Sequence, residues 1–74
     1  MIKMSENLTL KACRIIANVK AEELAVYVGV TVDTIYKWER GKSLPDLLQM
    51  RKIIEYLAKK GYAVDMNEIN FLKS

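Results

Sequence analysis

Apolar residues recur at three- and four-residue intervals along two stretches of the chain, which is the spacing of a helix that buries one face. The first stretch covers residues 9–18, and either Thr9 or Asn7 can cap its start. The second covers residues 45–60, begins at a Pro-Asp pair and stops before Gly61, a residue suited to the position after a helix end. Both stretches therefore predict amphipathic helices.

The segment between these stretches is harder to interpret, because residues 26–32 are rich in β-branched side chains that favour a strand. An isolated hairpin is only marginally stable, however, and no other segment offers the additional strands that a sheet needs. The cap residues fit helices better, since Gly29 can end one short helix and Thr31 can begin the next. The segment therefore predicts two short helices that meet at a tight glycine turn.

A fifth, closing helix is expected over residues 65–72. Asp65 and Glu68 have the spacing of a capping box, and Val64 and Ile69 stand where a hydrophobic staple would flank it. The predicted fold is therefore all-α, a compact bundle of about five helices around one core.

Composition narrows the class of protein further. The chain has 74 residues, of which 51% are apolar and 28% charged, and a chain this short is expected to form a single domain over residues 1–74. It contains no histidine and one cysteine, Cys13, which excludes an intramolecular disulfide, a Cys/His zinc site and a Ser-His or Cys-His nucleophile pair. We therefore expect no enzyme activity, no metal and no cofactor, and we expect Cys13 to be a core residue.

Location and charge add two weaker constraints. The longest uncharged apolar stretch, residues 24–32, is far shorter than the ~20 residues that cross a bilayer, and the N-terminus does not look like a secretory signal. These features and the single cysteine favour a cytoplasmic protein without a membrane partner. The net charge of +3 and the pI of about 9.1 permit a polyanionic partner without requiring one.

A spaced pattern through the centre of the chain is more specific than its composition. The pattern is Leu10-(x3)-Arg14-(x4)-Val19-(x2)-Glu22-Glu23-Leu24-Ala25-(x3)-Gly29-Val30-Thr31-(x3)-Ile35-(x2)-Trp38-Glu39-Arg40-Gly41-(x3)-Pro45. Over roughly Leu10 to Leu72 it resembles the lambda-repressor/Cro-like helix-turn-helix family, also called the Xre family. The resemblance implies a five-helix lambda-repressor-like DNA-binding domain, with the motif at about 20–41, a recognition helix at about 32–40 and C-terminal helices over 45–72.

The resemblance also implies roles for individual residues of the motif and of the helix before it. Inward-facing Ile35 and Trp38 anchor the recognition helix, and Arg14 and Glu39 form a structural ion pair that ties the first helix to its end. The residues that read bases in the major groove are Val32, Asp33, Thr34 and Lys37. The residues that contact phosphates are Lys20, Tyr36, Arg40, Lys42 and Ser43.

Three of these four side chains suit a particular base. Val32 can pack on a thymine methyl group, Asp33 can accept a hydrogen bond from a cytosine amino group, and Lys37 can donate to guanine. Asp33 equally favours the start of its own helix through the helix dipole. The implied partner is a double-stranded DNA operator bound by a homodimer, without a small-molecule ligand, and the implied function is that of a small transcriptional regulator of the phage or mobile-element repressor type.

Two departures from the family favour an alternative. The family usually carries a serine or threonine cap followed by glutamine at the start of the motif, where this chain has Lys20 and Ala21, and the charges between residues 20 and 42 cancel. The same fold could then serve as a protein-interaction module, such as an anti-repressor, an antitoxin-like protein or a recombination accessory factor, with weak or no DNA binding. The chain also has more large apolar residues than one small core can hold, and some of them could form an exposed patch for self-association. These residues are Leu48, Tyr56, Phe71 and Leu72.

Overall fold

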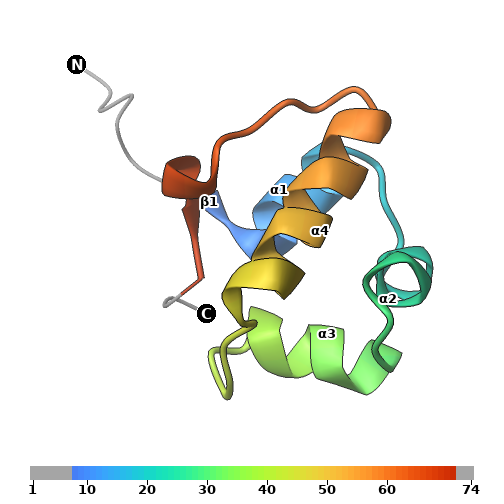
Figure 1. The fold of residues 1–74 in the computed structure, drawn as a ribbon, viewed down its shortest axis with the longest axis vertical. Coiled ribbons are helices and arrows are strands. Elements are labelled where there is room, and N and C mark those ends of the chain that lie inside the picture. The colour runs from blue at the N-terminus through green and yellow to red at the C-terminus, as the bar shows by residue number, and fades with distance from the viewer. Residues whose placement is uncertain (1–7, 72–74) are drawn as a thin grey trace.

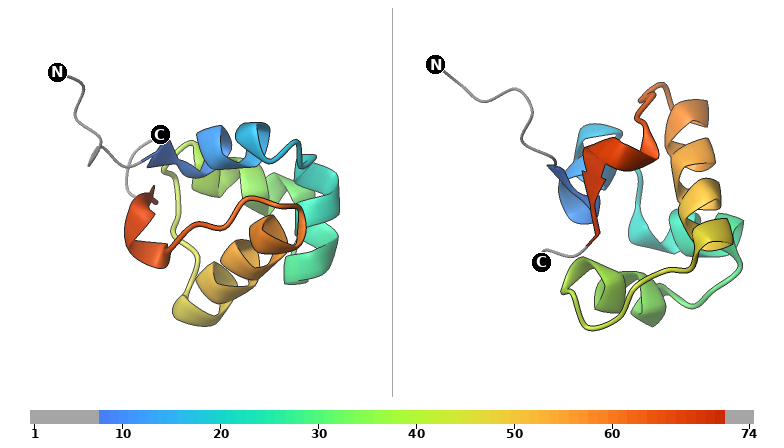
Figure 2. Two further views of the ribbon diagram at one scale, coloured as in Figure 1. Left: turned by 90° about the horizontal axis from the view of Figure 1, so that it is seen from above. Right: turned by 60° about the vertical axis from the view of Figure 1, so that its left-hand side comes forward.

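The computed structural model describes residues 8–71, which form four α-helices, one 3₁₀ turn and two very short strands (Figure 1). In chain order these are β1 (Leu8–Thr9), α1 (Leu10–Ile16), α2 (Ala21–Val28), α3 (Val32–Glu39), α4 (Leu47–Lys59), η1 (Met66–Glu68) and β2 (Ile69–Asn70). The helices surround one core, and the segments at the two ends of the described chain lie side by side (Figure 2). The structure is therefore mostly helical, as the apolar spacing predicts.

Three of the four α-helices begin with a side-chain cap at the predicted position. The Thr9 hydroxyl accepts a hydrogen bond from the Ala12 amide at 3.2 Å. Asp46 and Gln49 form a capping box at the start of α4, in which each side chain accepts a hydrogen bond of 2.8 Å from the other residue's amide. The predicted starts of these two helices are confirmed; Asn7, the alternative cap of the first, lies outside the described residues.

The β-branched segment in the middle of the chain is helical. Gly29 ends α2 in the left-handed region at φ 89°, a conformation that costs glycine little because it has no Cβ. The Thr31 side chain then caps α3 by accepting a hydrogen bond from the Thr34 amide at 3.2 Å. The prediction of two short helices that meet at a glycine turn is confirmed, and the strand that propensity alone favours does not form there.

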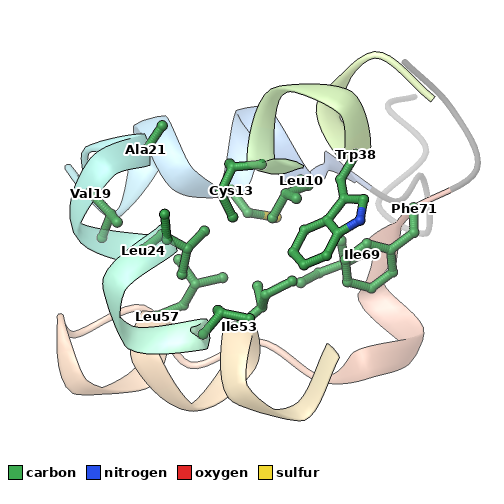
Figure 3. Close-up of a cluster of buried hydrophobic side chains, with 13 residues drawn as sticks. Leu10, Cys13, Val19, Ala21, Leu24, Trp38, Ile53, Leu57, Ile69 and Phe71 are labelled. Atoms are coloured by element: carbon green, nitrogen blue, oxygen red, sulfur yellow. The ribbon is translucent and has the colours of Figure 1, made fainter. Parts of the chain in front are cut away.

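The core contains residues from every helix and from the C-terminal segment (Figure 3). Its buried apolar members are Leu10, Cys13, Val19, Ala21, Leu24, Ala25, Val28, Ile35, Trp38, Ile53, Leu57, Ile69 and Phe71. Trp38 is 4% exposed and points from α3 toward Ile69 and Phe71. The predicted core position of Cys13 is confirmed, since its side chain is fully buried.

The prediction of a fifth helix over residues 65–72 is wrong. The capping contact forms, since the Asp65 amide donates to Glu68 Oε1 at 2.7 Å, but only the 3₁₀ turn η1 follows it. The chain then becomes extended as β2, which pairs in parallel with β1 in the register Leu8 with Ile69. Extended backbone puts alternate residues on one side, so Ile69 and Phe71 can both enter the core, whereas on a helix they would lie on different faces. Leu72 lies outside the described residues.

A polar cluster on the surface joins α2 to α4. The Tyr27 hydroxyl donates to Glu55 at 2.6 Å, and the Tyr56 hydroxyl donates to Glu23 at 3.0 Å. The two tyrosine rings lie 4.8 Å apart between their centroids, and the Lys60 ammonium lies 3.7 Å from Glu23. These contacts hold α2 in its orientation relative to α4.

Alkaline pH should weaken the fold. Burial raises the pKa of the Cys13 thiol above its ordinary 9.0, burial together with Cys13 raises the pKa of Tyr62 above 10.0, and the hydrogen bond to Glu55 raises the pKa of Tyr27. A group that holds its proton more tightly in the folded state stabilises the fold below its ordinary pKa and loses that contribution as the pH rises through the raised value. We expect the thermal midpoint to fall as the pH rises above about 9.

Circular dichroism melts at a series of pH values test this expectation. Tyr27→Phe should make the decline shallower, because it removes one of the three groups that release a proton on unfolding. A thermal midpoint that stays constant or increases as the pH is raised above 9 would contradict the stated direction of the pKa shifts.

Candidate nucleic-acid interface

The second helix of the motif has one buried side and one free side. Ile35, Trp38 and Glu39 of α3 are buried, with exposed fractions of 0%, 4% and 8%. The exposed residues at the opposite side and the end of this helix are Asp33, Tyr36, Lys37 and Arg40. This division leaves a polar, partly cationic flank of α3 open to a partner while the other flank is held by the core.

The predicted base readers differ in how far they can reach. Asp33 and Lys37 are exposed and form an ion pair of 3.6 Å one helical turn apart. Val32 is half-buried against the core, and Thr34 is half-buried with its hydroxyl 3.0 Å from that of Thr31. An exposed ion pair of this kind contributes less than about 1 kcal/mol, so a base could displace it at little cost. Asp33 and Lys37 are therefore the most available of the four.

The predicted phosphate contacts fall into separate places. Tyr36 and Arg40 lie one turn apart on the same flank of α3, and Lys42 and Ser43 are exposed in the loop that follows this helix. Lys20 is exposed at the start of α2, where its side chain makes no capping hydrogen bond. The five residues are all exposed, and they come from the start of α2, from α3 and its end, and from the loop that follows.

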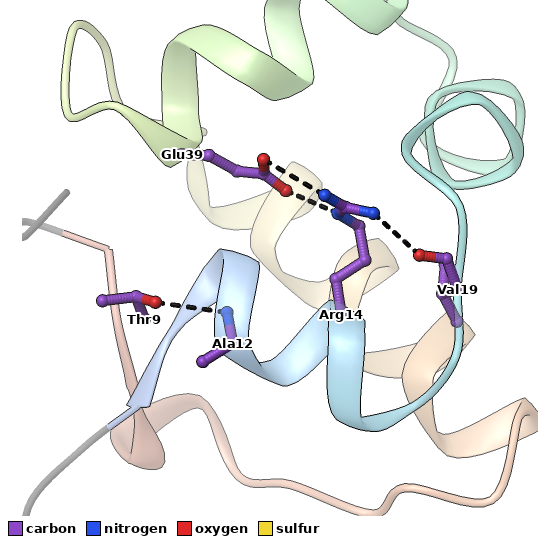
Figure 4. Close-up of polar contacts among 5 residues, drawn as sticks. All are labelled: Thr9, Ala12, Arg14, Val19 and Glu39. Carbon is purple, nitrogen blue, oxygen red and sulfur yellow. Dashed lines mark hydrogen bonds and ion pairs between the residues drawn. The ribbon is translucent and has the colours of Figure 1, made fainter.

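Arg14 connects α1 to the end of α3 and to the segment that leads into α2 (Figure 4). Its guanidinium donates to both carboxylate oxygens of Glu39, at 2.6 Å and 3.4 Å, and its third contact is the Val19 carbonyl oxygen at 2.9 Å. The side chains of Arg14 and Glu39 are only 13% and 4% exposed. The pair therefore holds the C-terminal end of α3 against α1 and against the segment that leads into α2.

Lys11 is the residue that sequence reasoning missed. The structure places it in a notch of about 390 Å³ between α1 and the end of α3, together with Arg14, Tyr36, Glu39 and Arg40. One signal was available, because Lys11 precedes Arg14 by three residues and so shares its helix face. That spacing alone does not say which residues of α3 lie opposite.

An apolar surface lies beyond the loop that follows α3. Leu44, Leu47 and Leu48 are 52%, 60% and 63% exposed, although leucine is usually buried. A groove of about 490 Å³ adjoins Leu44, and its apolar lining is Leu44, Met50, Met66, Ile69 and Phe71. Of the residues expected in excess of the core, Leu48 is exposed, Tyr56 is half-buried and Phe71 is buried.

Within residues 8–71, no group of three or more cysteine, aspartate or glutamate side chains is placed to hold a metal ion. Over the same residues, no helix has the length and apolar character needed to cross a membrane.

Comparison with known proteins agrees with this geometry. A family model described as helix-turn-helix matches residues 10–61, which contain all four α-helices. The comparisons with curated proteins and with solved structures gave no match. The match covers more than half of the chain and the two helices that meet at Gly29 form the motif, so the chain belongs to the Xre, or lambda-repressor-like, helix-turn-helix family of DNA-binding regulators.

Proposed function

We propose that the protein is a small transcriptional regulator of the repressor/Cro type that binds double-stranded DNA sequence-specifically, with α3 in the major groove and without catalysing a reaction. The observation that carries the proposal is the exposed flank of α3, which presents Asp33, Tyr36, Lys37 and Arg40 while Ile35 and Trp38 anchor the helix. A helix with its side chains is about 10–12 Å wide, which suits a major groove of about 12 Å.

The order of residues along α3 supports a division of labour. Asp33 lies in the first turn and Lys37 one turn later, so both can face base edges, where carboxylate and ammonium groups suit cytosine and guanine respectively. Tyr36 and Arg40 lie beside this stripe, and Lys42 follows in the loop, in positions suited to the phosphate ridge. The stripe would then read the sequence, and the flanking residues would set the register.

Selection of binding sites from a pool of randomised duplexes tests the proposal. We expect recovery of a short inverted repeat, with half-sites about 34 Å apart, and a steep loss of affinity as salt increases. A pool that shows no enrichment, together with no binding to any duplex at low salt, would overturn it.

Lys37 and Arg40 should respond differently to substitution. Lys37→Ala should cost about 1–3 kcal/mol of binding free energy on the selected operator and relax specificity at one base position, because it removes a base contact. Arg40→Ala should weaken binding to all sequences alike and reduce the slope of log affinity against log salt by about 1. Fluorescence anisotropy with operator variants measures both effects. Equal losses from both substitutions on every variant would contradict the division of labour.

We further propose that the operator is bound by a homodimer. In a two-fold dimer the same patch of both subunits meets, and a surface that combines a ridge with a neighbouring groove can complement itself. The exposed Leu47 and Leu48 provide the ridge, and the groove beside Leu44 provides the recess. Leu48→Glu should therefore shift the protein toward monomer in sedimentation experiments. One protomer that protects a single half-site at saturating concentration would contradict the dimer.

A second candidate function is supported by the start of α2. Lys20 occupies the cap position without a side-chain hydrogen bond, and the Asp33–Lys37 pair reduces the charge that α3 offers to DNA. Both features suit a helix-turn-helix module that binds another protein, in the manner of an anti-repressor, an antitoxin-like protein or a recombination accessory factor. Absence of duplex binding at low salt would favour this function, and a steep salt dependence would exclude it as the main one.

A further inference from the structure

The notch between α1 and α3 contains cations that the helix-turn-helix motif alone does not include. Its lining residues are Lys11, Arg14, Tyr36, Glu39 and Arg40, and its volume is about 390 Å³. A water molecule occupies about 30 Å³ of liquid, so the notch has room for a larger polar group. Lys11 comes from α1, whereas Tyr36 and Arg40 come from the end of the recognition helix.

The charges in the notch do not balance. Glu39 uses both carboxylate oxygens to accept hydrogen bonds from Arg14, so this acid and this base neutralise each other. Among residues 8–71, the ion pairs involve neither Lys11 nor Arg40, and both side chains are exposed. Two positive charges and the hydroxyl of Tyr36 therefore remain available to an acceptor that enters the notch.

We propose that the notch binds one phosphate group of the DNA backbone and that Lys11 is a phosphate contact outside the motif. This inference rests on the proposed DNA-binding function. The lysine ammonium, the arginine guanidinium and the phenol hydroxyl are all hydrogen-bond donors, and a phosphate oxygen accepts from each of them. Because Tyr36 and Arg40 lie on the flank of α3 beside the base-reading stripe, a phosphate ridge next to that stripe reaches the notch.

The exposure of the notch favours a phosphate held within a polymer over a free one. Lys11 and Arg40 are exposed, and Tyr36 retains 36% of its surface, so a small anion in the notch would stay in contact with water. Exposed charge pairs contribute at most about 1 kcal/mol each, which is too little to hold a free anion tightly. A backbone phosphate can bind with this small free energy, because the rest of the interface already holds the duplex in place.

The test compares two exposed lysines that differ only in place. Lys11→Gln removes one of the two available cations from the notch. Lys59→Gln removes a cation at the end of α4, and this end of the helix lies far from α3 (Figure 1). On the selected operator, Lys11→Gln should reduce affinity about five-fold and lower the salt slope by about 0.9, with the same loss on all operator variants. Lys59→Gln should leave both quantities within error of the wild-type values. Equal effects of the two substitutions would overturn the assignment of Lys11.

A second arm identifies the source of the phosphate. Duplexes in which one phosphate at a time is replaced by an uncharged methylphosphonate should abolish the difference between wild type and Lys11→Gln at one position in each half-site. In parallel, inorganic phosphate is titrated at constant ionic strength while the amide resonances of residues 11, 36 and 40 are followed. Saturable binding of free phosphate combined with no position-specific effect in the duplex would assign the notch to a free anion and overturn the proposal.

The two arms separate this inference from the function on which it rests. If wild-type protein binds no duplex, the proposed function fails first and the notch proposal fails with it. If wild-type protein binds its operator with a steep salt dependence but Lys11→Gln binds equally well, only the notch proposal fails.

Discussion

Replacing Glu39 with glutamine should lower the free energy of unfolding by about 3–5 kcal/mol, because it leaves the largely buried guanidinium of Arg14 without its ionic partner. The Arg14 side chain is 13% exposed and uses its guanidinium to contact both carboxylate oxygens of Glu39 and the Val19 carbonyl oxygen. A neutral amide offers one acceptor oxygen and no compensating charge. The expected loss is a large part of the total stability of a chain of this length, which is roughly 4–11 kcal/mol.

Urea unfolding of the single and double variants measures this loss. Arg14→Met combined with Glu39→Leu should recover much of the stability, because apolar residues of similar size avoid both the unpaired charge and the cost of removing two charges from water. A double variant as unstable as the single one would indicate that the contact to Val19, and not the ion pair, holds α1 against the motif. A Glu39→Gln variant of wild-type stability would contradict the prediction.

The restored double variant also shows what the pair does for DNA binding. If the pair mainly fixes the end of α3 relative to α1, the double variant should be stable but should bind the operator less tightly, because Tyr36 and Arg40 would lose their fixed position. Anisotropy at several salt concentrations would separate this effect from a loss of charge, since the substitutions remove one positive and one negative charge together.

The local signals in the sequence predict most of the helices for physical reasons. Thr9, Thr31 and Asp46 cap helices through contacts within three residues along the chain, and Gly29 ends α2 because a left-handed residue is needed there. Such interactions do not depend on distant segments, so they can be read from a single sequence. The same reasoning identifies the buried and free sides of α3.

The C-terminal segment shows where local signals fail. Asp65 and Glu68 form the predicted capping contact, yet a helix does not continue, because Ile69 pairs with Leu8 at the other end of the described chain. That pairing joins residues about sixty positions apart and depends on how α1 and α4 have already placed the two ends. Neither the strand pair nor the burial of Phe71 beside Trp38 could be predicted from nearby residues.

The candidate site likewise contains some features that the local sequence predicts and others that depend on tertiary packing. The periodicity of α3 identifies Asp33 and Lys37 as exposed, because neighbouring residues on a helix fix which side faces the core. The notch that contains Lys11 depends on the packing of α1 against the end of α3, and the sequence pattern does not determine that packing in detail. Placing Lys11 opposite the end of α3 therefore required the tertiary structure, whereas identifying the exposed side of α3 did not.

Replacing Ile53 with alanine should lower the free energy of unfolding by about 2–5 kcal/mol, because it removes buried methyl groups and leaves a cavity. Ile53 is fully buried on α4 and lies in the core with Leu57 (Figure 3). Its backbone is helical, so alanine introduces no local strain, and the slightly higher helix propensity of alanine offsets only a small part of the packing loss. Urea or thermal unfolding measures it, with the far-ultraviolet circular dichroism spectrum as a check that the helices remain.

Ile15→Ala provides a matched control, since it makes the same chemical change on the surface of α1, where Ile15 is 60% exposed. This variant should remain within about 0.5 kcal/mol of wild type, because few contacts are lost and alanine favours the helix slightly more than isoleucine does. If both substitutions destabilise the protein equally and independently of its concentration, Ile53 does not occupy the closed core described above. If the effect of Ile15→Ala grows as the protein is concentrated, Ile15 is covered in an assembly. The dimer would then use α1 in place of the surface formed by Leu44, Leu47 and Leu48.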